Sequence, residues 1–355
     1  MMCNIARMQQ RASALGVSLR PHVKTSKCVE VARRQQAAGA SGITVSTLKE
    51  AEQFFDAGFA DVLYAVGMAP SKLDRALALR RRGCALTIAV DSVAAAQAVI
   101  ATGHAFDALI EVDCDGHRSG VQPDDSLLIE IGRTLHDGGV ILKGVMTHAG
   151  SSYDLDTPEA LQRLAEQERS RSVRAAQRLR AAGLPCPVVS VGSTPTALSA
   201  ENLAGVTELR AGVYVFFDLV MANVGVCGLD NLALSVLTTV IGHQPEKGWA
   251  IVDAGWMAMS RDRGTQRQKI DYGYGAVCDL AGAPLDGLIM TGANQEHGIV
   301  SRRGTADPDI AQRLPVGTQL RILPNHACAT GTQFSEYHAV SGARPAQQWR
   351  RFDGW

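Results

Sequence analysis

The sequence lacks the features that mark several common classes of protein. Its 35 basic and 35 acidic residues cancel, so no net charge favours a nucleic acid or an anionic membrane as partner. No apolar run approaches the roughly 18–20 residues that a membrane-spanning helix needs. The first residues contain no apolar core of the kind found in a signal peptide. With 46% apolar and 20% charged residues, the composition is that of a globular protein with a large core.

The cysteines form no recognisable framework. There are eight of them in 355 residues, with no CxxC pair, which favours reduced thiols and a cytoplasmic location. Most are expected to be small core residues, and Cys328 is the exception treated below. They stand at Cys3, Cys28, Cys84, Cys114, Cys186, Cys227, Cys278 and Cys328.

No GxGxxG motif follows the first apolar run, which argues against a dinucleotide-binding sheet. Instead, eight short and continuously apolar runs alternate with amphipathic segments, a pattern typical of parallel strands buried on both faces. Eight strands close a (β/α)8 barrel, and this α/β fold is the one we expect. The strands are predicted over residues 17–23, 42–46, 61–65, 86–91, 108–113, 143–148, 188–191 and 208–217, and the helices over residues 1–14, 28–38, 48–57, 72–82, 93–102, 126–136, 157–182 and 195–203.

The pattern changes after about residue 218. Short β-type runs separated by Gly, Pro and Asp follow one another, and we expect no regular helix between them. The predicted domains are therefore a barrel over residues 1–224 and a β-rich domain over residues 225–355. In the second domain, strands are predicted over residues 232–241, 248–253, 287–291, 298–301 and 319–323.

One lysine stands where the first strand is expected to end. Pro21 favours an extended backbone just before it, so Lys24 is placed at the start of a loop. A lysine facing inward from a strand end is costly unless it is paired or neutral, and a desolvated lysine loses its proton readily and acts as a nucleophile or base. The alternative is a basic surface turn, because Arg20, His22 and Lys27 lie close by.

The segment 192–196 has the composition of an anion site. Ser193 and Thr194 offer hydroxyl groups, and Pro195 suits the first residue of a helix, whose N-terminus favours a phosphate. Gly212, after the eighth strand, could complete the site, since barrels often bind phosphate in the loops after strands 7 and 8. A phosphate site combined with an inward lysine indicates pyridoxal phosphate (PLP). The alternative is a simple capped loop.

A second group of polar residues lies near the C-terminus. His326 and Cys328 are one residue apart, and on an extended chain both would face the same side. An imidazole with a thiolate favours Zn²⁺ over Mg²⁺ or Ca²⁺, and two protein ligands leave positions open for water or substrate. The alternative is a buried structural pair.

Together these segments resemble a known family. The chain is similar to the D-serine dehydratase and D-threonine aldolase family, which are PLP enzymes of the alanine-racemase-like fold (fold type III), and the similarity runs in order along nearly the whole chain. The resemblance implies a barrel followed by a β domain, a divalent metal that is expected to be Zn²⁺, and a homodimer. Its motifs are Arg-Pro-His-Val-Lys-Thr-Ser-Lys at 20–27, Thr-His-Ala-Gly-Ser at 147–151, Gly-Ser-Thr-Pro-Thr at 192–196 and Pro-Asn-His-Ala-Cys at 324–328.

The resemblance also implies roles for individual residues. Lys24 matches the lysine that binds PLP covalently, and His148 matches the histidine that lies against the pyridine ring. Arg118 matches an arginine near the phenolic oxygen, and Arg210 matches one that faces the pyridine nitrogen. The matches in the phosphate region are Ser193, Thr194, Gly212 and Tyr214, and those in the metal pair are His326 and Cys328.

The implied activity is the loss of water from a D-3-hydroxy amino acid. Lys24 would remove the Cα proton, while a metal on His326 and Cys328 would bind the departing hydroxyl as a Lewis acid. The expected products are oxaloacetate and ammonia from D-threo-3-hydroxyaspartate, or pyruvate from D-serine. Aldolase members commonly carry aspartate where this chain has Cys328, which favours the dehydratase. The alternatives are retro-aldol cleavage, as in D-threonine aldolase, and, in a different class, a non-catalytic PLP carrier.

The beginning of the chain departs from the family. Relatives start with a further strand that joins the β domain, whereas this chain starts inside the first barrel helix. We therefore expect either a shortened start or a β domain with one strand fewer.

Overall fold

The computed structural model describes residues 1–342 and 344–355, which form two compact units. The barrel unit contains Met2–Tyr214 and the final residues Trp349–Trp355. The β unit contains Met1 and Val215–Gln348. The boundary expected between residues 224 and 225 falls inside the β unit, just after helix α9 (Leu219–Val224).

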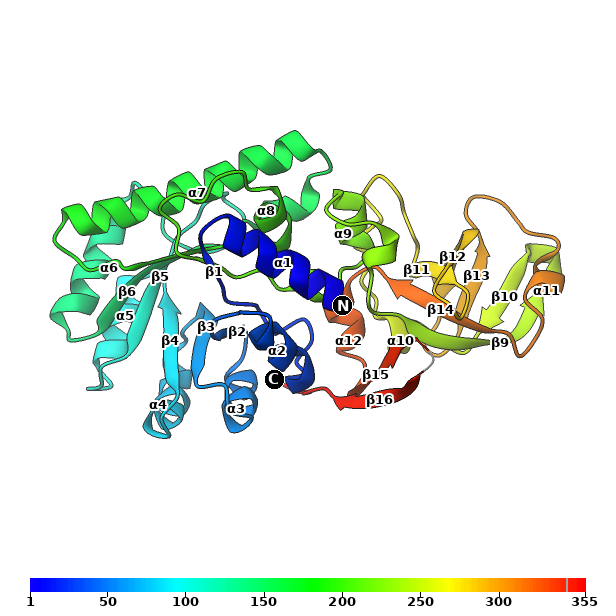
Figure 1. Ribbon diagram of the computed structural model, residues 1–355, viewed down its shortest axis with the longest axis horizontal. Coiled ribbons are helices and arrows are strands. Elements are labelled where there is room, and N and C mark those ends of the chain that lie inside the picture. The colour runs from blue at the N-terminus through cyan, green and yellow to red at the C-terminus, as the bar shows by residue number, and fades with distance from the viewer. Residues whose placement is uncertain (343) are drawn as a thin grey trace. The chain divides into compact units, whose positions relative to one another are not determined.

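The barrel unit is built on eight parallel strands (Figure 1). Their order in the sheet is β1-β8-β7-β6-β5-β4-β3-β2. Most strand residues are buried, as expected for strands covered on both faces. The strands are β1 (Ser18–Leu19), β2 (Ile43–Val45), β3 (Asp61–Gly67), β4 (Ala85–Val90), β5 (Asp107–Glu111), β6 (Ile141–Met146), β7 (Val188–Val191) and β8 (Glu208–Leu209).

Backbone hydrogen bonds bring the two ends of this sheet together. Ser41 N donates to Leu19 O at 2.8 Å, and Thr44 N donates to Pro21 O at 2.9 Å. Val23 N in turn donates to Thr44 O at 2.9 Å. The segment after β1 is thereby joined to β2, and the predicted eight-stranded barrel architecture is confirmed.

Helices alternate with these strands and lie outside them (Figure 1). Their starts follow from the sequence, because several of the preceding residues accept a hydrogen bond from the first turn, as N-cap residues do. The N-caps are Thr47, Ser92, Asp125, Thr157 and Ser193. The helices are α1 (Met2–Ala14), α2 (Val29–Ala37), α3 (Leu48–Asp56), α4 (Leu73–Arg81), α5 (Val93–Ile100), α6 (Ser126–Asp137), α7 (Pro158–Ala181) and α8 (Thr194–Ser199).

The eighth strand is shorter than the sequence predicts. It was expected over residues 208–217, but β8 ends at Leu209 and a 3₁₀ turn, η3 (Val213–Val215), follows. Residues 208–217 are all buried, so their hydrophobicity does not distinguish a strand from a buried turn. Phe217, with φ of 51°, lies in the left-handed region of backbone conformation and outside the extended region of a regular strand.

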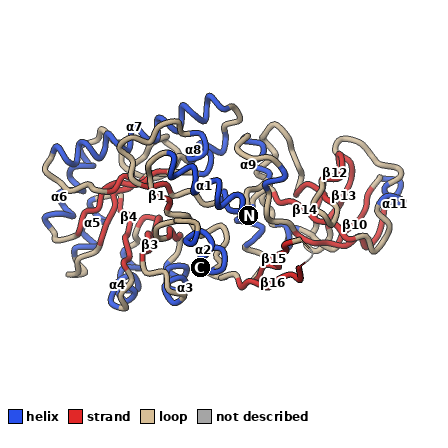
Figure 2. The backbone as a smooth tube through the Cα atoms, in the orientation of Figure 1, coloured by secondary structure: helices blue, strands red, loops and turns tan. Residues whose placement is uncertain are grey.

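The β unit contains a closed six-stranded barrel around its own core. The strand order is β10-β13-β12-β11-β14-β9, all pairs are antiparallel, and the predicted β domain is confirmed. Figure 2 shows that strands and loops dominate this unit. The strands are β9 (Val236–Gln244), β10 (Trp249–Val252), β11 (Gly275–Cys278), β12 (Pro284–Ala293), β13 (Gly298–Arg302) and β14 (Gln319–Pro324), with β15 (Glu336–Ser341) and β16 (Arg344–Arg350) as a separate pair.

The expectation that this part of the chain has no helix is wrong. Besides α9, three short helices lie between or after its strands: α10 (Trp256–Met259), α11 (Ile310–Arg313) and α12 (Ala327–Gly331). Each has only one or two turns, which is too short to produce a detectable helical period in the sequence.

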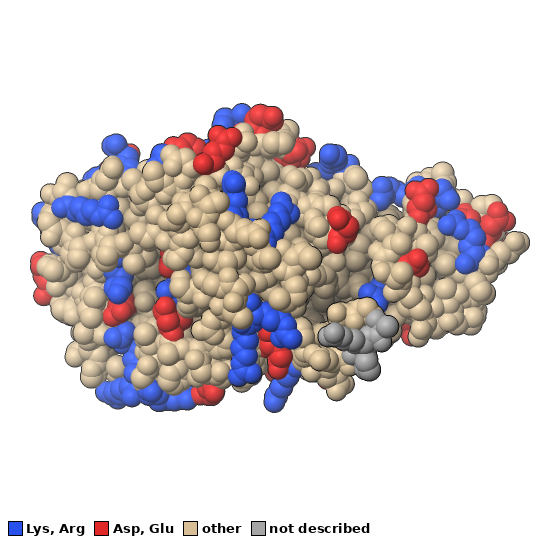
Figure 3. All heavy atoms as spheres, viewed as in Figure 1, with Lys and Arg blue, Asp and Glu red and all other residues tan. Residues whose placement is uncertain are grey.

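Charged side chains of both signs are dispersed over the face shown in Figure 3, where other residues form most of the surface. This distribution agrees with the absence of net charge. In the described part of the chain, no helix has the length and hydrophobicity needed to cross a membrane.

Candidate active site

Lys24 lies in a turn directly after β1, at the carboxyl ends of the barrel strands. The turn is fixed by its backbone: Lys27 N donates to Val23 O at 2.7 Å, and His22 N donates to Ala211 O at 3.0 Å. Lys24 itself is half-buried. The structure therefore places this lysine where barrel enzymes carry their active sites.

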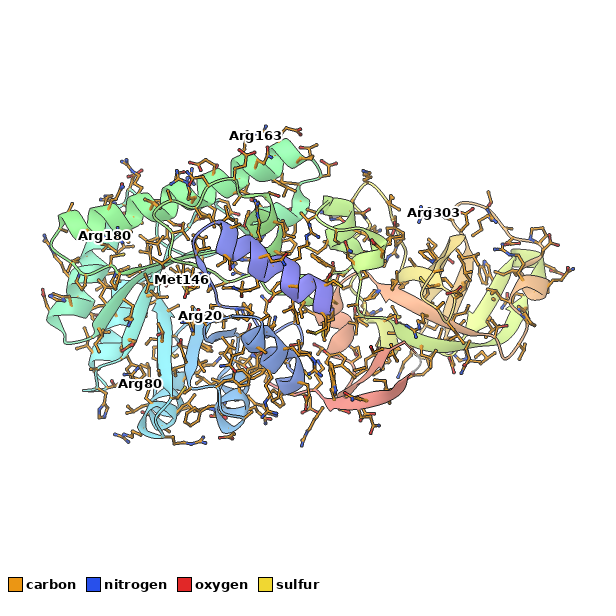
Figure 4. The ribbon with its side chains drawn as sticks, in the orientation of Figure 1. Arg20, Arg80, Met146, Arg163, Arg180 and Arg303 are labelled. Atoms are coloured by element: carbon orange, nitrogen blue, oxygen red, sulfur yellow. The ribbon has the colours of Figure 1, made fainter. Side chains whose placement is uncertain are left out.

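Two other basic residues of the motif, Arg20 and Lys27, are engaged in ion pairs. Arg20, labelled in Figure 4, contacts Glu208 at 2.9 Å and Asp61 at 2.8 Å. Lys27 contacts the buried carboxylate of Glu50 at 3.1 Å. These pairs contradict the alternative of a solvated basic turn and show that the motif is part of the barrel structure.

His22 faces the same region as Lys24. Burial lowers the pKa of His22 well below its usual value, and the charges of Lys24 and Arg210 lower it further. Its Nδ1 atom is buried and has no hydrogen-bond partner among the described residues, and its Nε2 lies 3.5 Å from Ser46 Oγ. A buried nitrogen without a partner is costly, so this position suits a bound molecule with polar atoms.

His148, which follows β6, is also held neutral. Its Nδ1 lies 3.1 Å from Gly192 O and donates to it. Burial, followed by the charges of Lys24 and Arg118, lowers the pKa of His148 to about 3. A neutral imidazole with its Nδ1 proton fixed presents a flat, uncharged ring, as the predicted contact with a pyridine ring requires.

Arg118 is exposed in the loop after β5. Its charge lowers the pKa of both His22 and His148. The loop turns at Asp113, whose carboxylate accepts hydrogen bonds from Asp115 N at 3.0 Å and Gly116 N at 2.6 Å.

Arg210, directly after β8, is buried inside the barrel unit. Its guanidinium donates to Ser190 Oγ at 2.6 Å and to Thr147 O. Burial lowers the pKa of Arg210, while the carboxylate of Glu208 opposes this shift. The side chain is thus held in one place, and its charge acts on both His22 and His148.

The hydroxyl groups expected at a phosphate are used within the protein. Ser193 Oγ caps α8 by accepting from Thr196 N at 3.2 Å, and it lies 2.9 Å from Ser152 Oγ. Thr194 Oγ1 accepts from Tyr214 N at 3.2 Å. A hydroxyl that accepts a hydrogen bond from a backbone N–H can still donate its own proton, so these contacts fit both the capped loop and a phosphate site, and the roles of Ser193 and Thr194 at a phosphate stay predictions.

Tyr214 and Gly212 have structural contacts as well. The hydroxyl of Tyr214 accepts a hydrogen bond from Gln35 Nε2 at 2.8 Å, and burial raises the pKa of Tyr214 above its usual value. A Cβ atom at Gly212 would lie 2.8 Å from His22 O, so only glycine allows the loop to pack against the lysine turn. Their roles at a phosphate stay predictions.

One residue of this region was not predicted from the sequence. Glu168 on α7 is buried, and its carboxylate accepts hydrogen bonds from Ala149 N and Gly192 N, in the loops after β6 and β7. The signal that could have identified it is a lone acidic residue in the apolar stripe of the helix predicted over residues 157–182.

The His326 and Cys328 pair lies in the β unit, and one expectation about it is wrong. The chain is not extended through both residues: β14 ends at Pro324, His326 is the N-cap of α12, and Cys328 lies in the first turn. The two side chains still meet, since a hydrogen bond to Cys328 is among the interactions of His326.

A carboxylate orients the histidine. His326 Nδ1 lies 2.7 Å from Asp262 Oδ2, which leaves Nε2 for another partner. Burial opposes the charged form, but hydrogen bonds to Asp262 and Cys328 outweigh it and raise the pKa of His326 to about 11. A carboxylate on one nitrogen of a histidine is the usual arrangement around a ligand to a metal, and a metal bound at the other nitrogen would displace the proton there.

The segment that carries the pair is held on both sides. Asp218 accepts hydrogen bonds from Ala327 N at 2.9 Å and from Met221 N at 3.0 Å. The Asn325 side chain donates to Gly273 O at 2.7 Å and accepts from Thr265 Oγ1 at 3.0 Å. Among the described residues, no group of three His, Cys, Asp or Glu side chains is arranged to bind a metal. The roles of His326 and Cys328 as metal ligands stay predictions.

The residues present fit the two expected groups. An amine at a barrel strand end, a neutral histidine, a buried cation and the partnerless Nδ1 of His22 suit a polar aromatic aldehyde beside Lys24. An oriented imidazole beside a thiol suits a soft divalent metal such as Zn²⁺.

Comparison with known proteins gives the family. Residues 1–220 match the alanine racemase N-terminal domain, and residues 233–340 match a serine dehydratase domain. The chain belongs to the family of alanine-racemase-like enzymes that includes the D-serine dehydratases and D-threonine aldolases. The resemblance inferred from the motifs, and with it the alanine-racemase-like fold, is confirmed.

Several relatives are similar over most of their length. D-threo-3-hydroxyaspartate dehydratase of Delftia sp. (strain HT23) is 70% identical over 358 residues, covering 99% of this chain and 94% of the relative. Its solved structure superposes with a TM-score of 0.99 and covers 100% of this chain and 95% of that one. A D-threonine aldolase of Arthrobacter sp. is 32% identical over 92% of this chain and 83% of the relative. A D-serine dehydratase of Dictyostelium discoideum is 29% identical, over 95% of this chain and 90% of the relative.

Two further solved structures are variants of D-threo-3-hydroxyaspartate dehydratase, both with a TM-score of 0.99 and 69% identity. The first covers 100% of this chain and 93% of its own, and the second covers 100% and 95%. In one a histidine is replaced by alanine, and in the other, a metal-free form, a cysteine is replaced by alanine. One residue separates the two replaced positions, as it separates His326 from Cys328.

Proposed function

We propose that this protein is a PLP- and Zn²⁺-dependent dehydratase that converts D-threo-3-hydroxyaspartate to oxaloacetate and ammonia, with D-serine as a secondary substrate. The observation that carries the proposal is the 70% identity to the Delftia dehydratase over 99% of the chain. The local arrangements around Lys24 and His326 support it, because each contains residues suited to one step of the reaction.

In the barrel unit, Lys24 would hold the cofactor and remove the Cα proton of the substrate. Pyridoxal phosphate, when bound, supplies an electron sink for the negative charge that forms at Cα. His148 stays neutral, so it can lie against an aromatic ring without adding charge. The buried guanidinium of Arg210 adds a fixed positive charge that disfavours protonation of neighbouring groups.

In the β unit, His326 and Cys328 would hold the metal, and Asp262 would keep the His326 ring in the orientation that exposes Nε2. Zn²⁺, when bound, supplies a Lewis acid for a departing hydroxyl group. The spacing of the histidine and cysteine replaced in the relative supports the assignment of these two residues.

The nearest alternative is retro-aldol cleavage, since a D-threonine aldolase is 32% identical to this chain. The 70% identity to a dehydratase favours the elimination. We further propose a homodimer, which the family resemblance implies, and a cytoplasmic location, which agrees with the lack of a disulfide bond between any of the eight cysteines, all of which the structure describes.

The test is a product assay. Purified protein with PLP and Zn²⁺ is incubated with D-threo-3-hydroxyaspartate, and oxaloacetate, ammonia and glycine are measured. Oxaloacetate and ammonia in equal amounts support the proposal, whereas glycine and glyoxylate would establish the aldolase instead. A colourless protein that forms no product would indicate that neither activity is present.

A further inference from the structure

Glu168 departs from the pattern of its helix. The buried residues of α7 are otherwise small or apolar, and Glu168 is 2% exposed among them. Arg163, labelled on α7 in Figure 4, is one of the exposed residues typical of the outer side of this helix. A buried carboxylate is costly unless hydrogen bonds compensate for the water it loses, so its partners should explain its presence.

Those partners lie in two loops that carry candidate site residues. Glu168 Oε1 accepts hydrogen bonds from Ala149 N at 3.1 Å and from Gly192 N at 3.0 Å. Ala149 directly follows His148, and Gly192 directly precedes Ser193. Burial raises the pKa of Glu168, while a hydrogen bond with Thr196 and the two backbone N–H groups oppose this shift.

The same two loops are joined by His148. Its Nδ1 donates to Gly192 O at 3.1 Å, and the N–H of Gly192 is held by Glu168. His148 is therefore fixed at two points: its ring through Gly192 O, and its backbone through the neighbouring Ala149 N. Both points depend on one oxygen atom of one carboxylate.

We propose that Glu168 is a positioning residue that sets the plane of the His148 imidazole against the cofactor ring. This inference rests on the proposed function, because it assigns the ring of His148 to bound pyridoxal phosphate. Glu168 lies on α7, outside the barrel strands, and would act on the orientation of the cofactor through His148 without touching the cofactor or the substrate.

Two substitutions separate positioning from charge. Glu168→Gln keeps the length of the side chain and one carbonyl oxygen that can accept from both N–H groups. Glu168→Asp keeps the charge but is one methylene shorter, so it cannot reach both loops without moving them. If Glu168 acts by spanning the two loops, PLP binding should be impaired in the Asp variant and close to wild type in the Gln variant. If it acts only through its charge, the reverse is expected.

Pyridoxal phosphate is titrated into each variant, and the visible circular dichroism of the bound cofactor is recorded because it reports the orientation of the ring. We expect the Asp variant to bind PLP about tenfold more weakly, the loss that a missing buried hydrogen bond typically causes, and to show altered circular dichroism. Glu168→Leu should show both effects more strongly. Glu166→Gln is the matched control, since Glu166 is exposed on the same helix and forms an ion pair with Arg169.

Unchanged PLP affinity and circular dichroism in a folded Asp variant would overturn the role of Glu168, while leaving the proposed function standing. Equally weakened PLP binding in the Gln and Asp variants would overturn the proposal that Glu168 acts by spanning the two loops. Reduced thermal stability with an unaltered cofactor signal would show a purely structural role. A wild-type protein that forms no visible band with PLP would overturn the proposed function, and this inference with it.

Discussion

His326 and Asp262 form a hydrogen-bonded pair, with 2.7 Å between Nδ1 of the imidazole and Oδ2 of the carboxylate. This hydrogen bond occupies the Nδ1 atom of His326, so Nε2 points away from the carboxylate. The carboxylate comes from a loop that lies 64 residues earlier in the chain, so the arrangement is a product of the fold of the β unit.

Replacing this carboxylate should weaken metal binding. Asp262→Ala leaves the His326 ring without its orienting partner, and Zn²⁺ affinity should fall by about 10- to 100-fold. Calorimetric titration with Zn²⁺ measures the effect. Glu336→Gln is the control, because Glu336 forms an exposed contact with His338 at 3.3 Å in the same unit. Equal Zn²⁺ affinity in wild type and Asp262→Ala would refute the assignment of Asp262.

The last residues of the chain stabilise the lysine turn. Phe352 N donates to Lys27 O at 2.7 Å, and the Phe352 ring packs edge-on against Phe54 with 5.0 Å between centroids. Phe352→Ala should lower the free energy of unfolding by about 2 kcal/mol, since the half-buried ring leaves a cavity. Trp355 is 81% exposed, so Trp355→Ala should change this value by less than about 1 kcal/mol. Urea unfolding measures both, and equal values for the two variants would contradict the prediction.

The neutral histidines of the barrel unit predict how stability depends on pH. The pKa of His148 is lowered to about 3 by burial and neighbouring cations, from 6.5 in an unfolded chain, and the pKa of His22 is lowered too. At pH values between about 3 and 6.5 the unfolded state binds more protons than the folded state. The free energy of unfolding is therefore highest above pH 6.5 and decreases as the pH falls below it. The slope should reach about 1.4 kcal/mol per pH unit for each histidine.

Urea unfolding at a series of pH values measures this slope. His148→Phe removes one titrating group, and its stability should fall less steeply than that of wild type between about pH 6.5 and pH 4. His104→Phe is the control for the substitution itself, because His104 is an exposed histidine of the same unit. Parallel pH profiles for wild type and His148→Phe would show that His148 is not held neutral by the fold.

The regular part of the fold could be predicted from the sequence because its signals are local. Continuous apolar runs identify parallel strands, and the helical spacing of apolar residues, maintained over residues 157–182, identifies α7. The end of β8 was not predictable in this way, since residues 208–217 are buried throughout and the turn at η3 is determined by packing.

The site was predictable only in part, for a similar reason. Lys24, His326 and Cys328 stand in short motifs, and their residue types alone indicate an amine nucleophile and a metal pair. Glu168 and Asp262 act through partners that are distant in sequence, so neither stands in a short motif. Glu168 is marked only as an acidic residue within the apolar stripe of its helix. The local conformation at Cys328 was mispredicted because a one-turn helix has no period.

In the proposed mechanism, Lys24 forms the covalent bond to pyridoxal phosphate. The direct measurement is reduction of the PLP-loaded protein with borohydride, followed by proteolysis and mass spectrometry of the peptide that contains residues 20–27. We expect one phosphopyridoxyl group on Lys24, and no label or visible absorbance band in Lys24→Ala. A label on Lys27, or full labelling and turnover in Lys24→Ala, would contradict it.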